Sequence, residues 1–335
     1  MKKTFIIAEL SANHNHNLQV AVDSIKAAAQ IGVDAVKIQT YTADSLTLNC
    51  DKEDFMIRGG LWDGYNLYKL YEEAFTPWEW HEELFRVAKE EGIVLFSTPF
   101  DKKAVDFLET LGNPIYKIAS FEIVDYELIR YAASKGKPMI MSTGIATEEE
   151  IDLAVKTCRD TGNNDITLLK CTSAYPARIE DANLNQIPAM REKFGVKTGL
   201  SDHSMGSLLP VLSVALGGQV VEKHFILDRN IGGPDAAFSM DRDEFAKLVK
   251  DIRETEAALG SGSFQNDTSE IKGREFARSL YVSRDIKEGE VITEDNIRCV
   301  RPGFGLHPRH YREVIGKKAK KNLFTGDRLA FQDIE

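Results

Sequence analysis

Short apolar stretches alternate with amphipathic stretches between residues 4 and 258. The apolar stretches are rich in Val and Ile, which is typical of buried strands, and the stretches between them repeat apolar residues every three or four positions, which predicts helices. The predicted strands lie near residues 4–9, 34–39, 92–97, 115–119, 138–142, 165–171, 197–200 and 219–225. Helical patterns include residues 18–29, 78–89, 102–111, 148–158 and 208–216.

Glycines mark the ends of several predicted helices. Each of them follows an apolar-periodic segment and precedes a strand, as helix-terminating glycines do: Gly32, Gly92, Gly136 and Gly162. Eight strand–helix units in about 250 residues fit a closed barrel. A doubly wound open sheet is the alternative, but no Gly-x-Gly-x-x-Gly sequence follows the first strand. We therefore predict an α/β fold, a (β/α)8 TIM barrel, over residues 1–260.

The chain changes character after residue 260. Residues 261–275 begin with small polar residues and are predicted to be a flexible linker. Residues 276–335 contain a strand-like stretch at 279–282 and Gly-containing turns, which predicts a small β-rich domain. This domain holds 12 Lys or Arg and 9 Asp or Glu, whereas the whole chain has a net charge of -10. A basic C-terminal module can therefore dock on an acidic body, in its own chain or in a partner.

Composition excludes several classes of protein. The 335 residues are 43% hydrophobic, enough for a sizeable core, but no apolar stretch is long enough to span a membrane and residues 5–8 are too short for a signal peptide. The acidic balance disfavours nonspecific nucleic-acid or membrane-surface binding. The four cysteines are far apart and form no Cys-x-x-Cys pair, which favours a reducing cytoplasm over a disulfide framework.

Polar residues gather where the predicted strands end, which is where (β/α)8 barrels place their active sites. Lys37 and Gln39 share one face of their strand because side chains alternate with period two. A lone strand lysine can be an edge residue that reaches solvent. Two lysines beside hydroxyls instead predict a site for a small, multiply charged anion such as phosphate: Lys37, Lys117, Thr98, Ser120, Ser142 and Ser201.

Other candidates follow from residue type. His203 and His224 end neighbouring strands and suit a divalent transition metal, to which Glu9 can add an oxygen ligand; two structural histidines are the alternative. Glu122 and Asp235 are predicted to act in general acid–base catalysis or to bind a hydroxylated substrate. Tyr175 is predicted to donate a hydrogen bond to a sugar. The three tryptophans are predicted to lie in the core and not to stack on a sugar, and His81 is predicted to lie on a solvated surface.

These motifs resemble the sialic acid synthase family over nearly the whole chain. The matching sequences are IAELSANH at 7–14, VKIQT at 36–40, STPF at 97–100, YKIAS at 116–120, MSTG at 141–144, SDHS at 201–204 and EKHF at 222–225. Residues 276–335, with RPG at 301–303, resemble the antifreeze-like (SAF) domain of that family. The resemblance implies a barrel joined to a SAF domain in a domain-swapped homodimer. It also implies condensation of phosphoenolpyruvate with an amino-sugar aldehyde, with Mn²⁺ or Mg²⁺ on His203 and His224 and Glu9 nearby.

The resemblance also implies roles for single residues. Those on the phosphoenolpyruvate side are Lys37, Thr98, Lys117, Ser120, Ser142, Ser173 and Ser201. Those on the sugar and water side are Glu122, Tyr175, Asp235 and Arg301 of the partner subunit. We take Glu9, Lys117, Glu122 and Tyr175 as catalytic candidates and Gln39 as a further substrate contact. Ser173 departs from the family, which usually has Asn at this position.

The sugar specificity depends on residues 233–239. Sialic and legionaminic members tend to read GPDHKAS, whereas this chain reads GPDAAFS. Two alanines line the pocket with side chains that are shorter and more apolar. Such a pocket suits a 6-deoxy sugar with acetamido groups and the pseudaminic branch of the family. Residues 61–80 also resemble that branch. The alternatives are a member that makes N-acetylneuraminic or legionaminic acid, a pyruvate-dependent metal aldolase, and a noncatalytic carbohydrate-binding protein.

Overall fold

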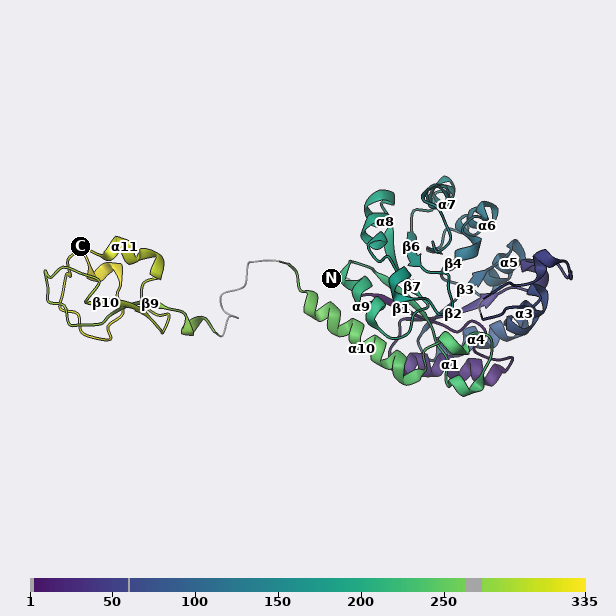
Figure 1. Ribbon diagram of the computed structural model, residues 1–335, viewed down its shortest axis with the longest axis horizontal. Coiled ribbons are helices and arrows are strands. Elements are labelled where there is room, and N and C mark those ends of the chain that lie inside the picture. The colour runs from purple at the N-terminus through teal and green to yellow at the C-terminus, as the bar shows by residue number, and fades with distance from the viewer. Residues whose placement is uncertain (1–2, 60, 263–272) are drawn as a thin grey trace. The chain divides into compact units, whose positions relative to one another are not determined.

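The computed structural model describes residues 3–59, 61–262 and 273–335. The chain divides into two compact units, Met1–Ser261 and Gly262–Glu335 (Figure 1). The predicted linker at residues 261–275 falls mostly on residues 263–272, outside the described residues. The first unit contains a closed barrel of eight parallel strands in sequence order, with β1 paired to both β2 and β8, so the predicted (β/α)8 class is confirmed.

The eight strands of the first unit lie close to their predicted positions, and so do the helices α1, α4, α5, α7 and α9. The strands are β1 Phe5–Glu9, β2 Ala35–Thr40, β3 Val94–Pro99, β4 Tyr116–Ile118, β5 Met139–Ser142, β6 Ile166–Cys171, β7 Lys197–Asp202 and β8 Val220–His224. The helices are α1 Leu18–Ile31, α2 Ala43–Leu46, α3 Leu67–Ala74, α4 His81–Glu90, α5 Lys102–Thr110, α6 Tyr126–Ala133, α7 Glu148–Asp160, α8 Gln186–Phe194, α9 Leu208–Ala215 and α10 Arg242–Leu259. All four glycines that were predicted to end helices have positive φ.

Local sequence explains where the helices begin. The side chain of Asn17 caps α1 by accepting hydrogen bonds from the main-chain nitrogens of Gln19 and Val20. At α7, Thr147 and Glu150 form a reciprocal capping box. Such caps satisfy main-chain donors that the first turn of a helix leaves free. These caps fix where α1 and α7 begin after their strands, and so fix the lengths of those two loops at the barrel mouth.

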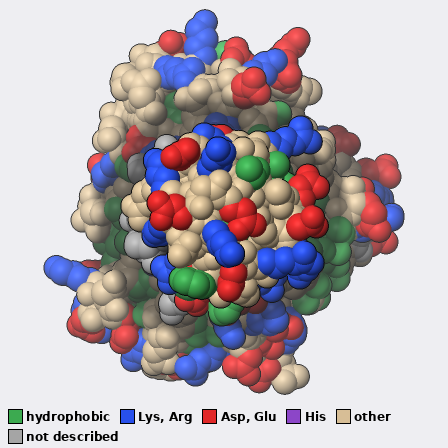
Figure 2. All heavy atoms as spheres, turned by 90° about the vertical axis from the view of Figure 1, so that its left-hand side faces the viewer, with side chains coloured by type: hydrophobic (Ala, Val, Ile, Leu, Met, Phe, Trp, Pro, Cys, Tyr) green, Lys and Arg blue, Asp and Glu red, His purple; other side chains and the backbone are tan. Residues whose placement is uncertain are grey.

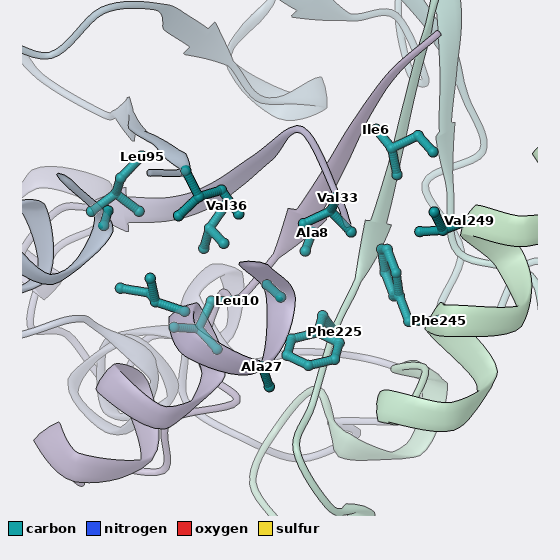
Figure 3. Close-up of a cluster of buried hydrophobic side chains, with 14 of the residues drawn as sticks. Ile6, Ala8, Leu10, Ala27, Val33, Val36, Leu95, Phe225, Phe245 and Val249 are labelled. Atoms are coloured by element: carbon teal, nitrogen blue, oxygen red, sulfur yellow. The ribbon is translucent and has the colours of Figure 1, made fainter. Parts of the chain in front are cut away.

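Side chains alternate between the barrel interior and the surrounding helices. On β1, Ile6 and Ala8 belong to the buried cluster that includes Phe245 and Val249 of α10 (Figure 3). Ile7 belongs to a separate apolar cluster with one residue from each of five other strands: Ala35, Phe96, Ile140, Leu169 and Val220. Because this inner layer is filled, the next inward positions toward the strand ends form the floor of the barrel mouth.

The second unit has its own core. The strands β9 Ser279–Val282 and β10 Ile297–Val300 pair in antiparallel fashion, and α11 Tyr311–Val314 follows. Buried residues from all parts of the unit form one cluster that includes Leu280, Ile286, Ile297, Val314 and Leu323. Basic and acidic side chains are interspersed on the face that Figure 2 shows.

The sequence also predicted that the chain has no membrane-spanning segment and no disulfide framework. In the described ranges, no helix combines the length and the apolar character needed to cross a bilayer. All four cysteines are free thiols.

Candidate active site

The inward positions at the C-terminal ends of the strands are polar in nearly every strand. They carry Glu9 on β1, Lys37 and Gln39 on β2, Thr98 on β3, Lys117 on β4, Ser142 on β5, Ser201 on β7, and Glu222 and His224 on β8. All except Gln39 and His224 are less than 6% exposed, and those two are half-buried. The same alternation that fills the inner apolar layer thus brings these residues together above it.

Two lysines and two carboxylates form a buried ionic quartet. Lys37 Nζ lies 2.5 Å from Glu9 Oε2 and 3.7 Å from Glu222 Oε1, and Lys117 Nζ lies 3.6 Å from Glu222 Oε1. Buried charges need such partners because desolvation would otherwise neutralise them. The sequence predicted two lysines ready to bind an anion, whereas the structure balances both of them with carboxylates. Lys117 has the looser pairing and is the lysine better placed to turn toward a ligand.

Hydroxyl groups orient both ammonium groups. Lys37 Nζ donates to Thr98 Oγ1 at 3.2 Å, and Lys117 Nζ donates to Ser142 Oγ at 2.7 Å. Burial lowers the pKa of Lys117 despite the nearby Glu222. Burial also disfavours the charged form of Lys37, but Glu222 and Glu9 raise its pKa above the ordinary value. Lys37 is therefore firmly cationic, whereas Lys117 gives up its proton more readily.

Glu222 is a site residue that the sequence analysis did not single out. Its Oε1 accepts a hydrogen bond from Ser201 Oγ at 3.3 Å, and its Oε2 is buried without a hydrogen-bond partner. Burial disfavours its ionisation, but Lys117 and Lys37 hold its pKa below the ordinary value. Strand alternation could have predicted this residue. Glu222 and His224 are two residues apart on one strand, so an inward His224 requires an inward Glu222.

The two predicted metal-binding histidines face each other. Their ring centroids are 5.3 Å apart. His203 Nδ1 lies 3.0 Å from the carbonyl oxygen of Thr172. Burial disfavours the charged form of His203, but the Cys171 thiol and this carbonyl raise its pKa. His224 Nδ1 is buried without a hydrogen-bond partner, and burial holds the pKa of His224 well below its ordinary value. A neutral imidazole with an unpartnered nitrogen beside a second imidazole held by a carbonyl fits a divalent metal ion.

The third predicted ligand does not join them. Among the residues that the structure describes, no group of three or more His, Cys, Asp or Glu side chains is arranged to hold a metal. Glu9 instead contacts Lys37 and accepts a hydrogen bond from Gln39 Nε2 at 3.1 Å. Burial raises the pKa of Glu9, which Lys37 partly offsets. The histidine pair therefore needs water or substrate oxygens to complete a coordination shell.

Loop residues extend the site above the strands. Ser120 Oγ and Ser173 Oγ lie 2.7 Å apart. A Cβ on Gly144 would lie 2.2 Å from Ser173 Oγ and 2.6 Å from Ser120 Oγ, so this glycine makes room for both hydroxyls. Nearby, Glu122 Oε2 is buried without a hydrogen-bond partner, and burial raises the pKa of Glu122 to about 7 despite Lys117. Glu122 is thus suited to exchange a proton near neutral pH.

An aromatic wall borders the histidines. The ring centroid of Tyr175 lies 4.4 Å from His203, 5.1 Å from Phe238 and 5.8 Å from Trp62. Trp62 also lines a cavity of about 620 Å³ whose other apolar walls include Leu61, Tyr65, Leu70, Pro234 and Ala237. The prediction of a core position does not hold for Trp62, which is half-buried at the edge of this cavity.

The remaining predicted residues divide between the units. Asp235 is buried, and its Oδ2 accepts a hydrogen bond from the main-chain nitrogen of Ala12 at 3.3 Å and lies 3.8 Å from His224 Nδ1. Gln39 Nε2 also donates to Ser11 Oγ at 3.0 Å. Arg301 is exposed in the second unit, just after β10, and its role in a sugar site stays a prediction.

The prediction for His81 was wrong. Its side chain is fully buried, and Nε2 lies 2.8 Å from Thr40 Oγ1. His81 lies on the same buried face of α4 as Leu84 and Ala88, three and seven residues further along. It therefore packs under β2 as a structural histidine, and burial lowers its pKa to about 4.

Comparison with known proteins gives consistent matches over both units. Residues 24–264 match the NeuB family and residues 277–335 match the SAF domain. A pseudaminic acid synthase of Campylobacter jejuni is 55% identical and covers 99% of this chain and 97% of its own length. One of Helicobacter pylori is 51% identical, with coverage of 98% and 97%. The crystal structure of an N-acetylneuraminic acid (sialic acid) synthetase from Leptospira borgpetersenii is 32% identical, with a TM-score of 0.73 over 82% of this chain and 91% of that chain.

Proposed function

The chain belongs to the NeuB family and ends in a SAF domain, and from this premise we propose that it is an enzyme that makes pseudaminic acid. It condenses phosphoenolpyruvate with 2,4-diacetamido-2,4,6-trideoxy-L-altrose and water, and releases phosphate. The observation that carries this proposal is the convergence of Lys37, Lys117 and their hydroxyl partners with two imidazoles at one barrel mouth.

The lysines and hydroxyls bind phosphoenolpyruvate in this proposal. Lys117 is the main anion contact, because its nearest carboxylate oxygen is 3.6 Å away while that of Lys37 is at 2.5 Å. Ser142, Ser120 and Ser173 add hydroxyl donors on the same side, in line with the serine and threonine contacts expected for a phosphoryl group. Each charge-assisted hydrogen bond contributes about 1.5–3 kcal/mol.

Two imidazoles hold the metal in this proposal. His203 and His224 would bind Mn²⁺ or Mg²⁺, which supplies Lewis-acid polarisation of the sugar aldehyde oxygen when bound. The carbonyl oxygen of Thr172, 3.0 Å from His203 Nδ1, fixes the tautomer that presents Nε2. Asp235, close to His224, faces the sugar hydroxyl groups.

The bond changes follow from the positions of these groups. The enol carbon of phosphoenolpyruvate forms a bond to the aldehyde carbon, water adds at C2, and phosphate leaves with the bridging oxygen as the C–O bond breaks. Glu122 accepts the proton of the attacking water, since its buried carboxylate has a free oxygen and a pKa of about 7. Lys117 keeps the departing phosphate oriented.

The cavity beside Trp62 favours the trideoxy sugar. Its lining combines apolar side chains with Asn15, His16 and Glu73, and Ala237 stands where sialic and legionaminic members tend to carry a basic residue. A 6-methyl group gains from contact with the apolar part of this lining and a hydroxymethyl group does not, which favours a 6-deoxy sugar over N-acetylmannosamine. Synthesis of N-acetylneuraminic or legionaminic acid is the alternative.

One incubation tests the proposed function. The purified protein is mixed with phosphoenolpyruvate, Mn²⁺ and, in separate reactions, the trideoxy altrose, N-acetylmannosamine and the diacetamido precursor of legionaminic acid. We expect phosphate release and a nine-carbon keto acid, by mass spectrometry, chiefly with the first sugar. Turnover with pyruvate in place of phosphoenolpyruvate would identify an aldolase, and sugar binding without turnover would identify a noncatalytic protein.

We also propose that two copies complete each other's sites in a domain-swapped homodimer, in which Arg301 of the partner subunit contacts the sugar. Four free thiols and phosphoenolpyruvate-dependent chemistry suit a reducing cytoplasm.

A further inference from the structure

Each of the two imidazoles has a charged neighbour that the proposed reaction does not use. Asp202 precedes His203, and Lys223 precedes His224. Because Ser201 and Glu222 face the barrel interior, strand alternation turns Asp202 and Lys223 outward, beneath the helical layer. They are nonetheless only 4% and 1% exposed. An ion pair so far from water needs an explanation other than surface solubility.

The pair closes a compact network around His203. Lys223 Nζ lies 2.7 Å from Asp202 Oδ2 and also donates to the carbonyl oxygen of Ser204. Asp202 Oδ1 accepts from the main-chain nitrogen of Ser204 at 2.9 Å, and Oδ2 accepts from Ser204 Oγ at 3.0 Å. The residues on both sides of His203 are thus tied to the residue that precedes His224.

This network begins where the strand ladder ends. The last paired residues of β7 and β8 are Asp202 and Lys223, so main-chain pairing does not reach His203. Beyond that point His203 is held by the bond from Ala177 N to its carbonyl oxygen, 3.1 Å, and by Thr172. The side-chain pair extends the connection between the two strands by one residue, to the level of the imidazoles.

Stability alone does not explain the charges. A buried ion pair is seldom more stabilising than apolar side chains of similar volume. Two residues earlier, the same strands place Leu200 opposite Val221 on the same outer face, and both are buried. An apolar pair would therefore suit the outer face at Asp202 and Lys223 as well. What an apolar pair cannot do is bind both the main chain and the hydroxyl of Ser204.

We propose that the Asp202–Lys223 ion pair is a positioning device that sets the spacing of His203 and His224 for metal binding. This inference rests on the proposed function, specifically on the assignment of those two histidines as metal ligands. Asp202 and Lys223 touch neither metal nor substrate and act through the main chain of their neighbours. Residues that orient metal ligands typically change metal affinity about 10- to 100-fold when they are removed.

The experiment measures Mn²⁺ affinity directly, by isothermal titration calorimetry on the full-length chain. The test variants are Asp202→Asn and Lys223→Met, with the double variant as a third because it removes both charges together and leaves no unpaired buried ion. The matched control is Asp34→Asn. Asp34 also joins two elements, through Arg253 Nη2 at 2.6 Å and Ile6 N at 2.9 Å, but it precedes β2 at the opposite end of the barrel. His203→Ala is the reference for a lost ligand.

We expect the Mn²⁺ dissociation constant to rise about 10- to 100-fold in the Asp202 and Lys223 variants. Asp34→Asn should lower the melting temperature without changing the dissociation constant. If His203→Ala loses Mn²⁺ while the Asp202, Lys223 and double variants bind it as tightly as the original chain, the pair is only structural and the inference fails while the proposed function stands. If the original chain turns over but His203→Ala still binds Mn²⁺ normally, the ligand assignment fails and the inference with it.

Discussion

Two buried lysines of the barrel differ in what their ammonium groups face. Lys117 points into the mouth and donates to Ser142 Oγ at 2.7 Å. Lys170 sits on β6 between the inward residues Leu169 and Cys171, so it turns outward, and it donates to the carbonyl oxygen of Cys171 at 2.7 Å. Both lysines are buried, but they point in opposite directions, and Lys117 also lies 3.6 Å from Glu222 Oε1. Position relative to the mouth, and not burial, should therefore decide which lysine binds substrate.

Replacing each of these lysines by methionine tests that statement. Lys117→Met removes one charge-assisted contact worth about 1.5–3 kcal/mol, so the KM for phosphoenolpyruvate should rise about 10- to 150-fold. Lys170→Met is the control and should leave that KM unchanged. Steady-state kinetics with saturating sugar measures both, and equal effects in the two variants would contradict the assignment of Lys117.

The pH dependence of turnover reports on Glu122. Burial raises its pKa to about 7, so the carboxyl group is protonated below that pH and cannot accept a proton from water. The ionisable groups around it are Lys117, Asp125, Tyr71 and Tyr175. We expect kcat to rise with pH through about 7. In Glu122→Gln, this rise with pH should disappear and kcat should fall about 10²- to 10⁴-fold. In Glu122→Asp, the rise should remain. If the rise persists in the glutamine variant, another group is responsible for the titration.

At the residue scale, alternation along strands predicted most of the inward groups, including Lys37 and Gln39 as a pair. It could not predict their partners, because the approach of Lys37 to Glu9 and Glu222 depends on closure of the barrel between β1 and β8. His81 shows the opposite case. Its burial follows from helical spacing with Leu84 and Ala88, so the sequence held the information and the interpretation missed it.

Two glycines of the barrel leave no room for a side chain, one within a strand and one in the loop after a strand. The atoms that an added Cβ would meet differ between them. A Cβ on Gly199, within β7, would lie 2.1 Å from the carbonyl oxygen of Val220 in the main chain of β8. A Cβ on Gly144, just after β5, would meet only side-chain atoms, chiefly the hydroxyls of Ser120 and Ser173. The main chain of a paired strand cannot move aside, whereas a side-chain hydroxyl can rotate away.

The two alanine variants should therefore behave differently. Gly199→Ala should lower the free energy of unfolding of the barrel by about 1–3 kcal/mol, as overpacking does. Gly144→Ala should leave stability nearly unchanged but raise the KM for phosphoenolpyruvate, because it displaces two hydroxyls. Urea unfolding and kinetics measure the two effects, and a loss of stability in Gly144→Ala with normal kinetics would remove its loop from the binding site.

The elements themselves were largely predictable. All eight strands of the barrel and the strand at 279–282 were found from periodicity, because buried strands carry continuous apolar stretches. The aromatic wall was not. Trp62 meets Tyr175 across more than a hundred residues of sequence, and no local pattern encodes the direction in which a loop folds over the mouth.

For the whole molecule, the question is whether the SAF domain of one copy serves the barrel of another. Arg301 and His203 lie in different units, so a domain-swapped dimer would build each site from two chains. Arg301→Ala and His203→Ala should each be nearly inactive alone. When the two are mixed and allowed to exchange subunits, about a quarter of the sites should regain both residues, because half of the dimers are mixed and each has one intact site. No recovery after verified exchange would contradict the swapped site.

The central claim is that the polar groups of the barrel mouth hold phosphoenolpyruvate for attack by its enol carbon and then for addition of water at C2. The most direct test runs the reaction in ¹⁸O-labelled water and determines the mass of the released phosphate. We expect unlabelled phosphate together with a labelled keto acid. Label in the phosphate would mean that the P–O bond breaks, which would contradict addition of water at C2 in this site.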